Sequence, residues 1–576
     1  MPRPRYSLWA AGSNSHGHLG ASHADDLHRF TRLSLPDGAD EPLQVACGAN
    51  HTLLLARDHA GETRVFVAGS NARGQLASSQ DPRLRLSFEA LDLADFCAGL
   101  ELPLGSNQYR PCEVAASWET SFVVLRSRDE AHSDVVVSLG ANDWGERGEA
   151  NASAVGTSVV AIDVAFEASA SSTVRVVQLR AGPRHVVALV EVAMHVDAEG
   201  GTDKNTERLL LGWGASRQGQ LGSRPLSEGP LPRITPTPNV LLLRSPYAST
   251  NITSVAVGKD HTAVLFGRLA EGLVEEELAS DDVYLFGSDK HGQLGPSNTA
   301  GSAKHAASMA RIGYHDRPSN RNFLSLNDLL NPSPAPSVDP ATCTFSSVHC
   351  TWNGTYVVTA QQRASRAPAA APPPPSTADD MPAVLACGLN SHGQLATSGS
   401  SEASQGGSRS RVSRIYLPPL PEHPSSGASP ASAPTTHGSS PPRIAGEPAD
   451  GAMTTLGSLA QTVELACGSE HVLALVSPAA GDRGRGANEV WAWGWNEHGN
   501  LGLAAGGTPV EEPGEAGDTE EAPLADVWTP TRVWPPSSIH ATTAHERYGT
   551  ALRVWAGNAT SWILVEDEEN DEAEQQ

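Results

Sequence analysis

The sequence of 576 residues predicts an all-β fold built from seven copies of one strand-and-turn unit, and three observations lead to this prediction. A glycine spacing, Gly-x4-Gly-x2-Gly or Ala, occurs seven times along the chain. A short apolar run precedes each copy, and in Val490–Gly494 it shows the side-chain alternation of a strand. Between successive copies lies a second half-unit of two apolar strands joined by a turn. Short antiparallel strands in a sevenfold repeat are typical of a seven-bladed β-propeller, a ring of small sheets.

The first half-unit is a strand followed by a glycine turn. Glycine supplies the positive φ and the close backbone approach that such turns require. The turns begin at Gly12, Gly69, Gly140, Gly214, Gly287, Gly388 and Gly494. The strands that enter them are Leu8–Ala11, Val65–Ala68, Val135–Leu139, Leu209–Trp213, Val283–Phe286, Val384–Cys387 and Val490–Trp493. One match to the spacing has little weight, but seven indicate an architecture.

The second half-unit is a pair of strands whose connecting turn often carries a histidine. The pairs start at Val45, Val114, Leu179, Val255, Val348, Leu465 and Val554. In four of them a histidine stands three residues after a glycine: His51, His185, His261 and His471. A side chain that recurs at a propeller turn is predicted to bond backbone groups and pack between blades, rather than to bind a ligand. Two other pairs have Thr120 and Gly354 at this position.

The offset between the two half-units predicts how the ring closes. The chain begins with a turn-entering strand, Leu8–Ala11, and ends with a strand pair, Leu552–Val565. Together the two ends complete one blade. Such a closure removes the sheet edge that an open array would leave exposed.

The domain prediction is one propeller over residues 1–566 followed by an acidic tail over 567–576. Three insertions have compositions too poor in apolar residues to offset their ordering entropy, and they are expected to be mobile loops at about 363–381, 398–454 and 504–525. In the segment 296–340, the apolar residues of Phe323–Leu330 predict a short helix that docks on the propeller.

Strand alternation also leads to an expectation about the two ends of the ring. Successive connections in an antiparallel blade alternate between the ends. We expect both kinds of glycine-containing turn at one end and every long insertion at the other. The turn end would then be the easier docking surface, because little loop entropy is lost there on binding.

Composition excludes several classes of function. The net charge of −25 and the pI of about 5.2 argue against a protein that coats nucleic acid, since neutralising phosphates requires clustered Lys and Arg. No apolar run reaches the length of about 18 residues that a membrane-spanning helix needs. Direct binding to nucleic acid or membrane is therefore not expected.

The cysteines and the motif search point to a non-enzymatic protein. The cysteines are odd in number, seven, and form no C-x-x-C pair, so we expect reduced core thiols without metal or disulfide, in the cytosol or nucleus. No nucleophile triad, phosphate-binding loop or H-E-x-x-H motif occurs. No catalytic residue and no cofactor are predicted.

The candidate partner-binding residues lie in and around the last glycine turn. They are Trp495, Glu497, His498, Glu470 and Trp562. Aromatic and charged groups gathered at loop positions are what an interface hot spot requires. The alternative is that tryptophans of this region, Trp491, Trp493 and Trp562 among them, belong to the core between blades.

These repeats resemble those of the regulator of chromosome condensation family, whose unit is W-G-x-N-x-x-G-Q-L-G followed by V-A-C-G-x-x-H-T. The resemblance touches all seven units, although Glu146-Arg147 replaces Gln-Leu in the third. Within the family, the chain is most similar to the fungal alpha-tubulin suppressor group. The segments that carry this similarity are Gly12–Asn14, Ala46–His51, Val257–Asp260, Gly468–His471, Trp493–Asn500 and Gly557–Val565.

The resemblance implies a seven-bladed propeller and a protein-binding function. In the alpha-tubulin suppressor group, the propeller pairs as a heterodimer with a small zinc protein of the CSL type. That pair supports Elongator-dependent modification of wobble uridines in tRNA and the synthesis of diphthamide. The alternative that the wider family implies is a guanine-nucleotide exchange factor for a Ran-like small GTPase.

Overall fold

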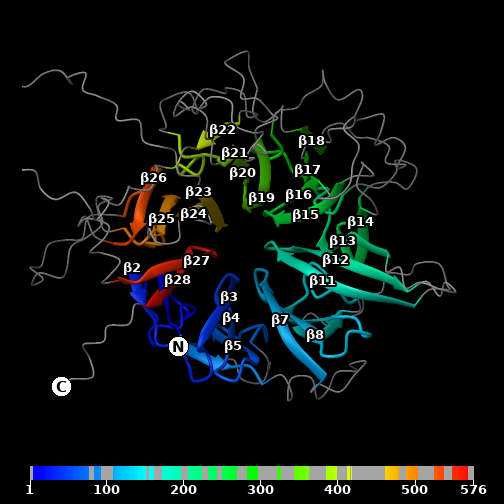
Figure 1. Ribbon diagram of the computed structural model, residues 1–576, viewed down its shortest axis with the longest axis horizontal. Helices are drawn as coiled ribbons and strands as arrows, with labels where there is room; N and C mark the ends of the chain where they lie inside the picture. The colour runs from blue at the N-terminus through cyan, green and yellow to red at the C-terminus, as the bar shows by residue number, and fades with distance from the viewer. Residues whose placement is uncertain are drawn as a thin grey trace, which may run out of the picture.

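The computed structural model describes residues 4–76, 83–92, 108–150, 155–160, 171–195, 205–222, 231–242, 250–268, 282–295, 321–325, 343–361, 384–397, 412–415, 417, 461–478, 488–503, 524–536 and 548–567. These residues form seven four-stranded antiparallel sheets, arranged as blades around a central axis (Figure 1). The predicted seven-bladed β-propeller is confirmed. Among the described residues, no helix has the length and apolar character needed to cross a membrane.

Each blade has four strands from the axis outward. The innermost strands are β3 (Glu41–Cys47), β7 (Tyr109–Ala116), β11 (Ser171–Ala181), β15 (Thr250–Val257), β19 (Cys343–Thr351), β23 (Gln461–Cys467) and β27 (Thr550–Ala556). The second strands are β4 (His51–Arg57), β8 (Thr120–Ser127), β12 (His185–His195), β16 (His261–Arg268), β20 (Gly354–Gln361), β24 (His471–Pro478) and β28 (Thr560–Asp567). These are the strand pairs of the second half-unit.

The two outer positions complete each blade. The third strands, which enter the glycine turns, are β5 (Thr63–Gly69), β9 (Val135–Ala141), β13 (Asn205–Ala215), β17 (Asp282–Gly287), β21 (Val384–Gly388), β25 (Glu489–Gly494) and β1 (Arg5–Gly12). The outermost are β6 (Arg85–Ala90), β10 (Val155–Val160), β14 (Ile234–Leu242), β18 (Arg321–Ser325), β22 (Ser413–Ile415), β26 (Val527–Trp534) and β2 (Leu27–Arg32). Blade 1 is β27, β28, β1 and β2, and blades 2 to 7 follow in chain order from β3–β6 to β23–β26.

The ring closes in blade 1 as the sequence predicts. Strand β1 pairs with β28 in antiparallel register from Arg5 opposite Asp567 to Gly12 opposite Thr560. The first and last strands of the chain thus share one sheet, with β1 between β28 and β2.

The hydrophobic core lies between neighbouring blades, because each face of a blade is covered by one of the two blades beside it. Four tryptophans are fully buried there: Trp213, Trp493, Trp534 and Trp562. Two of them also tie a blade to the glycine turn of the blade before it. Trp213 Nε1 donates to the carbonyl of Glu146 (2.7 Å), and Trp493 Nε1 donates to the carbonyl of Gln394 (2.9 Å).

The helix expected at Phe323–Leu330 is wrong where the structure describes the segment. Arg321–Ser325 is strand β18, paired with β17 from Asp282 opposite Ser325 to Phe286 opposite Arg321. Strand β17 has backbone N–H and C=O groups along its outer edge that need hydrogen-bond partners. Pairing with this edge outweighs the local helical pattern of the segment. Residues 326–330 lie outside the described residues.

Two predicted loop boundaries also need correction. The expected mobile segment 398–454 contains strand β22, in which Ile415 is buried, and the preceding Val412 is buried as well. The expected tail over 567–576 begins too early, because Asp567 is the last residue of β28 and accepts hydrogen bonds from Ser7 Oγ (2.7 Å) and Arg32 Nη2 (2.6 Å). Apart from Leu417, the rest of these segments, together with residues 362–383 and 504–523, lies outside the described residues.

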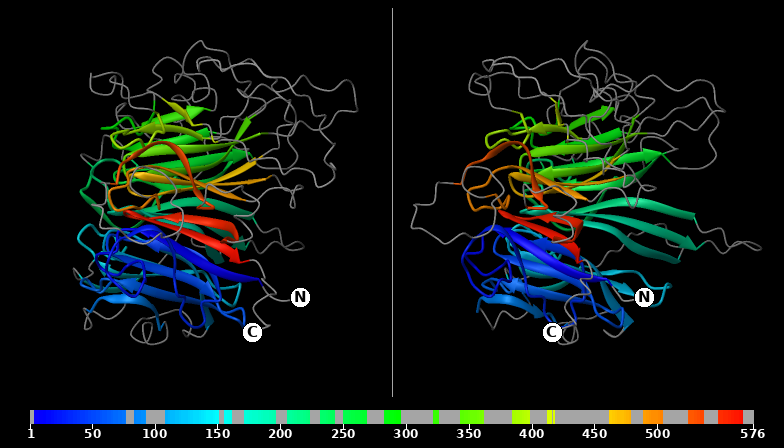
Figure 2. Two further views of the ribbon diagram at one scale, coloured as in Figure 1. Left: turned by 90° about the vertical axis from the view of Figure 1, so that its left-hand side faces the viewer. Right: turned by 60° about the vertical axis from the view of Figure 1, so that its left-hand side comes forward.

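The expectation of one end free of insertions is wrong. Figure 2 shows the blades from the side, with the glycine turns gathered at one end, opposite the start of β1 and the end of β28. We call this the turn end. Strands β17, β21 and β25 end at the turn end, so the long connections 288–320, 389–412 and 495–526 start there, whereas β20 and β22, which precede 362–383 and 416–460, end at the opposite end. The expectation assumed that the outermost strand of each blade comes before the long insertion. In the structure, the outermost strands β18, β22 and β26 come after the connections that start at the turn end.

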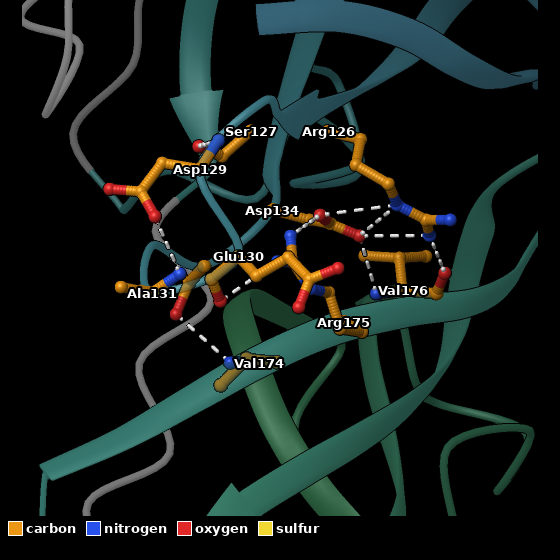
Figure 3. A network of polar contacts seen from close by, with 10 residues as sticks. Arg126, Ser127, Asp129, Glu130, Ala131, Asp134, Val174, Arg175 and Val176 are labelled. Carbon is orange, nitrogen blue, oxygen red and sulfur yellow. Dashed lines mark hydrogen bonds and ion pairs between the residues drawn. The ribbon is translucent and has the colours of Figure 1, made fainter. Parts of the chain in front are cut away.

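A buried ion-pair network joins blades 3 and 4 at the end opposite the turns (Figure 3). The Asp134 carboxylate has no exposed surface and accepts hydrogen bonds from Arg126 Nη2 (3.1 Å), Arg175 Nη1 (2.7 Å) and the amide of Val176 (3.0 Å). Arg126 also donates to the carbonyl of Val176 (3.0 Å). Because every partner comes from a strand or strand end, the network fixes the two blades against each other.

We expect Asp134→Ala to lower the free energy of unfolding by about 3–5 kcal/mol, because it leaves two guanidiniums without their buried counter-charge. Urea denaturation followed by tryptophan fluorescence measures the loss. Asp129→Ala is the matched control, since Asp129 belongs to the same loop but is 55% exposed, and its urea midpoint should stay close to that of the unchanged chain. Equal midpoints for both variants would show that the network does not hold the blades together.

Candidate protein-binding surface

The glycine turns are held by a recurring side-chain contact. In blade 7, the amide of Leu501 donates to Asn496 Oδ1 (2.9 Å), and the same contact recurs in blades 1 and 2. Gly499 has a φ of +72°, and a Cβ at this residue would lie 2.5 Å from the Cα of His28 on blade 1. Only glycine lets the turn approach the neighbouring outer strand this closely.

Blade 3 keeps this turn although Glu146 and Arg147 replace the usual Gln and Leu. The Glu146 carboxylate accepts a hydrogen bond from the amide of Trp144 (2.7 Å), as Gln394 Oε1 accepts one from the amide of His392 (2.8 Å) in blade 6. Burial raises the pKa of Glu146. The turn of blade 3 therefore keeps the same hydrogen bond as blade 6, although its sequence departs from the repeat.

The turn-end histidines of the strand pairs are structural, as predicted. His185, His261 and His471 are fully buried. Their Nε2 atoms lie 3.0–3.2 Å from a hydroxyl on the next blade, those of Thr262, Thr355 and Ser561. His51 is also fully buried, packed over Gly48. Burial lowers the pKa of His51 and His185 to about 3, and that of His261 and His471 to about 4.

Trp495 is the centre of a partly exposed cluster at the turn end. It directly follows β25, and its amide donates to the carbonyl of Glu470 (3.0 Å). Its indole lies between two imidazoles: the ring of His498 is 5.4 Å away edge-on, and the ring of His392 is 6.4 Å away. Glu497 is exposed beside it in the chain. The last glycine turn therefore presents an aromatic ring flanked by ionisable groups.

Each imidazole of the cluster is held by carboxylates from a neighbouring turn. His498 Nδ1 lies 2.9 Å from Asp26 Oδ2, which joins blade 7 to blade 1. His392 Nδ1 lies 2.8 Å from Asp526 Oδ2, and its Nε2 lies 3.3 Å from Glu470 Oε2. Burial raises the pKa of Glu470, while nearby His392 and Lys259 oppose that rise. We call Asp26, His392, Glu470, Trp495, His498 and Asp526 the Trp495 cluster.

The structure brings together most of the predicted site residues but not all of them. Trp495, Glu470 and His498 belong to the cluster, and Glu497 lies in the same turn. Trp562 is wrong as a binding residue, because it lies within β28 with no exposed surface and packs 6.2 Å from Phe88. The Trp562 side chain packs in the hydrophobic core between blades 1 and 2. The described residues contain no group of His, Cys, Asp and Glu suited to a metal ion.

Two tryptophans at the centre of the turn end were not predicted as site residues. Trp118 and Trp352 lie in the inner turns of blades 3 and 6, after β7 and β19, which face each other across the axis in Figure 1. Their rings meet at 5.6 Å, and Trp118 is 43% exposed. The signal was present in two of the three strand pairs that lack this histidine: they carry tryptophan two residues before the position of Thr120 or Gly354.

Comparisons with known proteins agree with this fold. The chain matches the regulator of chromosome condensation (RCC1) repeat over residues 209–265, from β13 into β16. A mouse protein described as a secretion-regulating guanine nucleotide exchange factor is 34% identical over 85 residues, a match that covers 15% of this chain and 17% of the mouse protein.

Two solved structures resemble the whole ring. Human WBSCR16 is similar over 98% of this chain and 100% of its own, with a TM-score of 0.54 and 17% identity. Yeast Prp20p (Saccharomyces cerevisiae), whose structure was reported with its binding to Gsp1p and histones, is similar over 99% and 93%, with a TM-score of 0.53 and 14% identity. The chain is therefore an RCC1-like seven-bladed β-propeller that carries a recognisable RCC1 repeat.

Proposed function

We propose that this chain is a protein-binding propeller that acts as a guanine-nucleotide exchange factor for a Ran-like small GTPase, and that it binds the GTPase through the Trp495 cluster. The observation that carries the proposal is the cluster itself, a half-exposed indole with ionisable groups from blades 6, 7 and 1 around it. The RCC1-like fold and the matched segment of a mouse exchange factor supply the class of partner.

Nucleotide exchange at this surface requires the chain to bind two states of the GTPase with different affinities. A protein accelerates nucleotide release when it binds the nucleotide-free GTPase more tightly than the nucleotide-bound form, and linkage then requires that added nucleotide weaken the complex. The carboxylates of the cluster are held by histidines before any partner arrives, so little side-chain entropy is lost on docking.

The direct test is the release of a fluorescent GDP analogue from a Ran-like GTPase with and without the purified chain. We expect release to be accelerated at least about tenfold at micromolar concentrations of the chain, and the complex to dissociate when excess GDP is added. Release at the intrinsic rate in the presence of saturating chain would contradict the proposal.

Trp495→Ala should weaken partner binding at least about 30-fold, equivalent to about 2 kcal/mol, because it removes an aromatic anchor. Its melting temperature should stay nearly unchanged, since the ring is partly exposed. Trp562→Phe is the control with the opposite pattern: it should lower the melting temperature and leave the affinity of the folded fraction unaltered. A parallel loss of stability and binding in Trp495→Ala would show that Trp495 serves the fold.

A second candidate is that the same cluster holds a small zinc protein of the CSL type in a heterodimer. Support comes from Glu470, Trp495, Glu497 and His498, which lie in the segments that resemble the alpha-tubulin suppressor group and come together at the turn end. In this role the chain would support Elongator-dependent tRNA wobble uridine modification and diphthamide synthesis in the cytosol or nucleus. Titrating a CSL-type zinc protein into the preparation used for the exchange assay separates the two: a complex without exchange activity favours this candidate.

A further inference from the structure

A second surface of the turn end borders the Trp495 cluster, where Lys259 lies near Glu470, and has the opposite charge. It consists of Trp118, Trp144, Arg184, Arg233, Lys259 and Trp352, from blades 3 to 6, and we call it the cationic patch. The carbon Cζ of Arg184 lies 4.6 Å from the ring centroid of Trp144, and that of Arg233 lies 4.8 Å from the same centroid. The ammonium of Lys259 lies 5.6 Å from the ring centroid of Trp352.

Backbone contacts make the patch continuous. The amide of Trp118 donates to the carbonyl of Pro183 (3.3 Å), the residue before Arg184. The amide of Lys259 donates to the carbonyl of Trp352 (2.9 Å), and the rings of Trp118 and Trp352 meet over the axis. The connections of blades 3 to 6 at the turn end therefore hold three indoles and three cations in one connected surface.

The two guanidiniums of the patch are not neutralised by this chain in its described residues. Arg184 and Arg233 are exposed, and both lie over one indole rather than beside a carboxylate. The acidic residues next to Trp118 and Trp144 in the chain pair with a different cation, since Arg73 binds Glu119 (3.4 Å) and Asp143 (2.9 Å).

The chemistry of this arrangement selects an anion with carboxylate geometry. A guanidinium carries its five N–H donors in its plane, so contact through its face with an indole leaves its edges available for a carboxylate. Two cations over one ring also repel each other, and an added anion relieves that repulsion. Trp118 beside them is the exposed aromatic surface on which an apolar side chain of the same ligand packs.

We propose that the cationic patch binds an acidic segment of a partner protein, one in which aspartates or glutamates flank an aromatic or aliphatic residue. Charge complementarity favours this ligand, because the patch is a positive area on a chain with a net charge of −25, so the rest of the surface repels acidic partners and directs them to this area. A nucleic acid is disfavoured, since a long phosphate chain would extend beyond the patch over a chain whose net charge is −25. This proposal does not rest on the exchange activity.

The probe is a fluorescein-labelled decapeptide of glutamates with two phenylalanines, titrated with the full chain and followed by fluorescence anisotropy. We expect saturable binding that weakens at least about tenfold when salt rises from 50 to 200 mM, and at least about tenfold in the double variant Arg184→Glu/Arg233→Glu. Trp118→Ala should weaken it by a similar factor, while Trp495→Ala should not change it.

Arg29→Glu is the matched control, because Arg29 is exposed on β2 of blade 1, away from the patch, and its charge reversal should leave the affinity unaltered. If Trp118→Ala lowers the melting temperature, Arg184→Gln/Arg233→Gln replaces it, since both arginines are exposed. Three results would overturn the proposal: no saturable binding, equal affinities in the patch variants and the unchanged chain, or tighter binding of a thymidine decanucleotide than of the peptide.

Discussion

A chain that lacks residues 1–11 is expected to lose at least about 5 kcal/mol of unfolding free energy. Eight residue pairs join β1 to β28, and Leu8, Ala10 and Ala11 are fully buried. Removing β1 exposes the edge of β28 and detaches β2, whose neighbour in the blade 1 sheet is β1. Urea denaturation monitored by tryptophan fluorescence measures the loss.

Removal of residues 1–4 is the matched control, because β1 begins at Arg5, and its urea midpoint should equal that of the full chain. If the longer deletion is insoluble, Leu8→Ala tests the same closure with an expected loss of about 2–5 kcal/mol. Should the chain without residues 1–11 unfold at the midpoint of the full chain, closure through β1 does not stabilise the ring.

Acidification from pH 7 to pH 5 is expected to destabilise the fold strongly. Burial lowers the pKa of six histidines: to about 3 for His51 and His185, and to about 4 for His18, His261, His349 and His471. Between pH 6.5 and about 4 the unfolded chain binds protons that the folded chain does not, so stability falls as the pH falls. Each histidine contributes about 2 kcal/mol of this loss at pH 5.

Buried carboxyl groups such as Glu113, whose pKa burial raises, act in the opposite direction and reduce the net loss. The measurement is the unfolding free energy from urea titrations at several pH values between 7 and 5. In His261→Gln the loss of stability between pH 7 and pH 5 should be smaller by about 1 kcal/mol per pH unit, whereas His59→Gln, at an exposed site, should keep the original slope. A stability that does not change between pH 7 and pH 5 would contradict the neutral, buried state of these imidazoles.

The strands that were predicted correctly are those whose own residues carry the structural signal. Third strands such as β25 end in glycines with positive φ, and second strands such as β24 are runs of mostly apolar residues buried on both faces. The sequence pattern that predicts these strands therefore does not depend on residues elsewhere in the chain. Closure of the ring followed from the order of these units alone.

The outermost strands were not predictable in this way. Strand β22 is only Ser413–Ile415, within a stretch rich in Ser, Pro and Gly, and β18 lies in a segment with a helical pattern. An outermost strand pairs along one edge only, so a few residues suffice and its composition is weakly constrained. Misplacing these strands also produced the wrong expectation about the two ends.

For the candidate site, the repeat pattern places Trp495, Glu497, His498 and Glu470 at one end of the ring, because turns of the same kind in repeated antiparallel blades must share an end. The repeat pattern does not reveal that Trp562 is core, or that Trp118 and Trp352 meet across the axis. The physical reason is that a local pattern specifies the strand and the turn in which a side chain lies. Its contacts with another blade depend on how all seven blades pack around the axis.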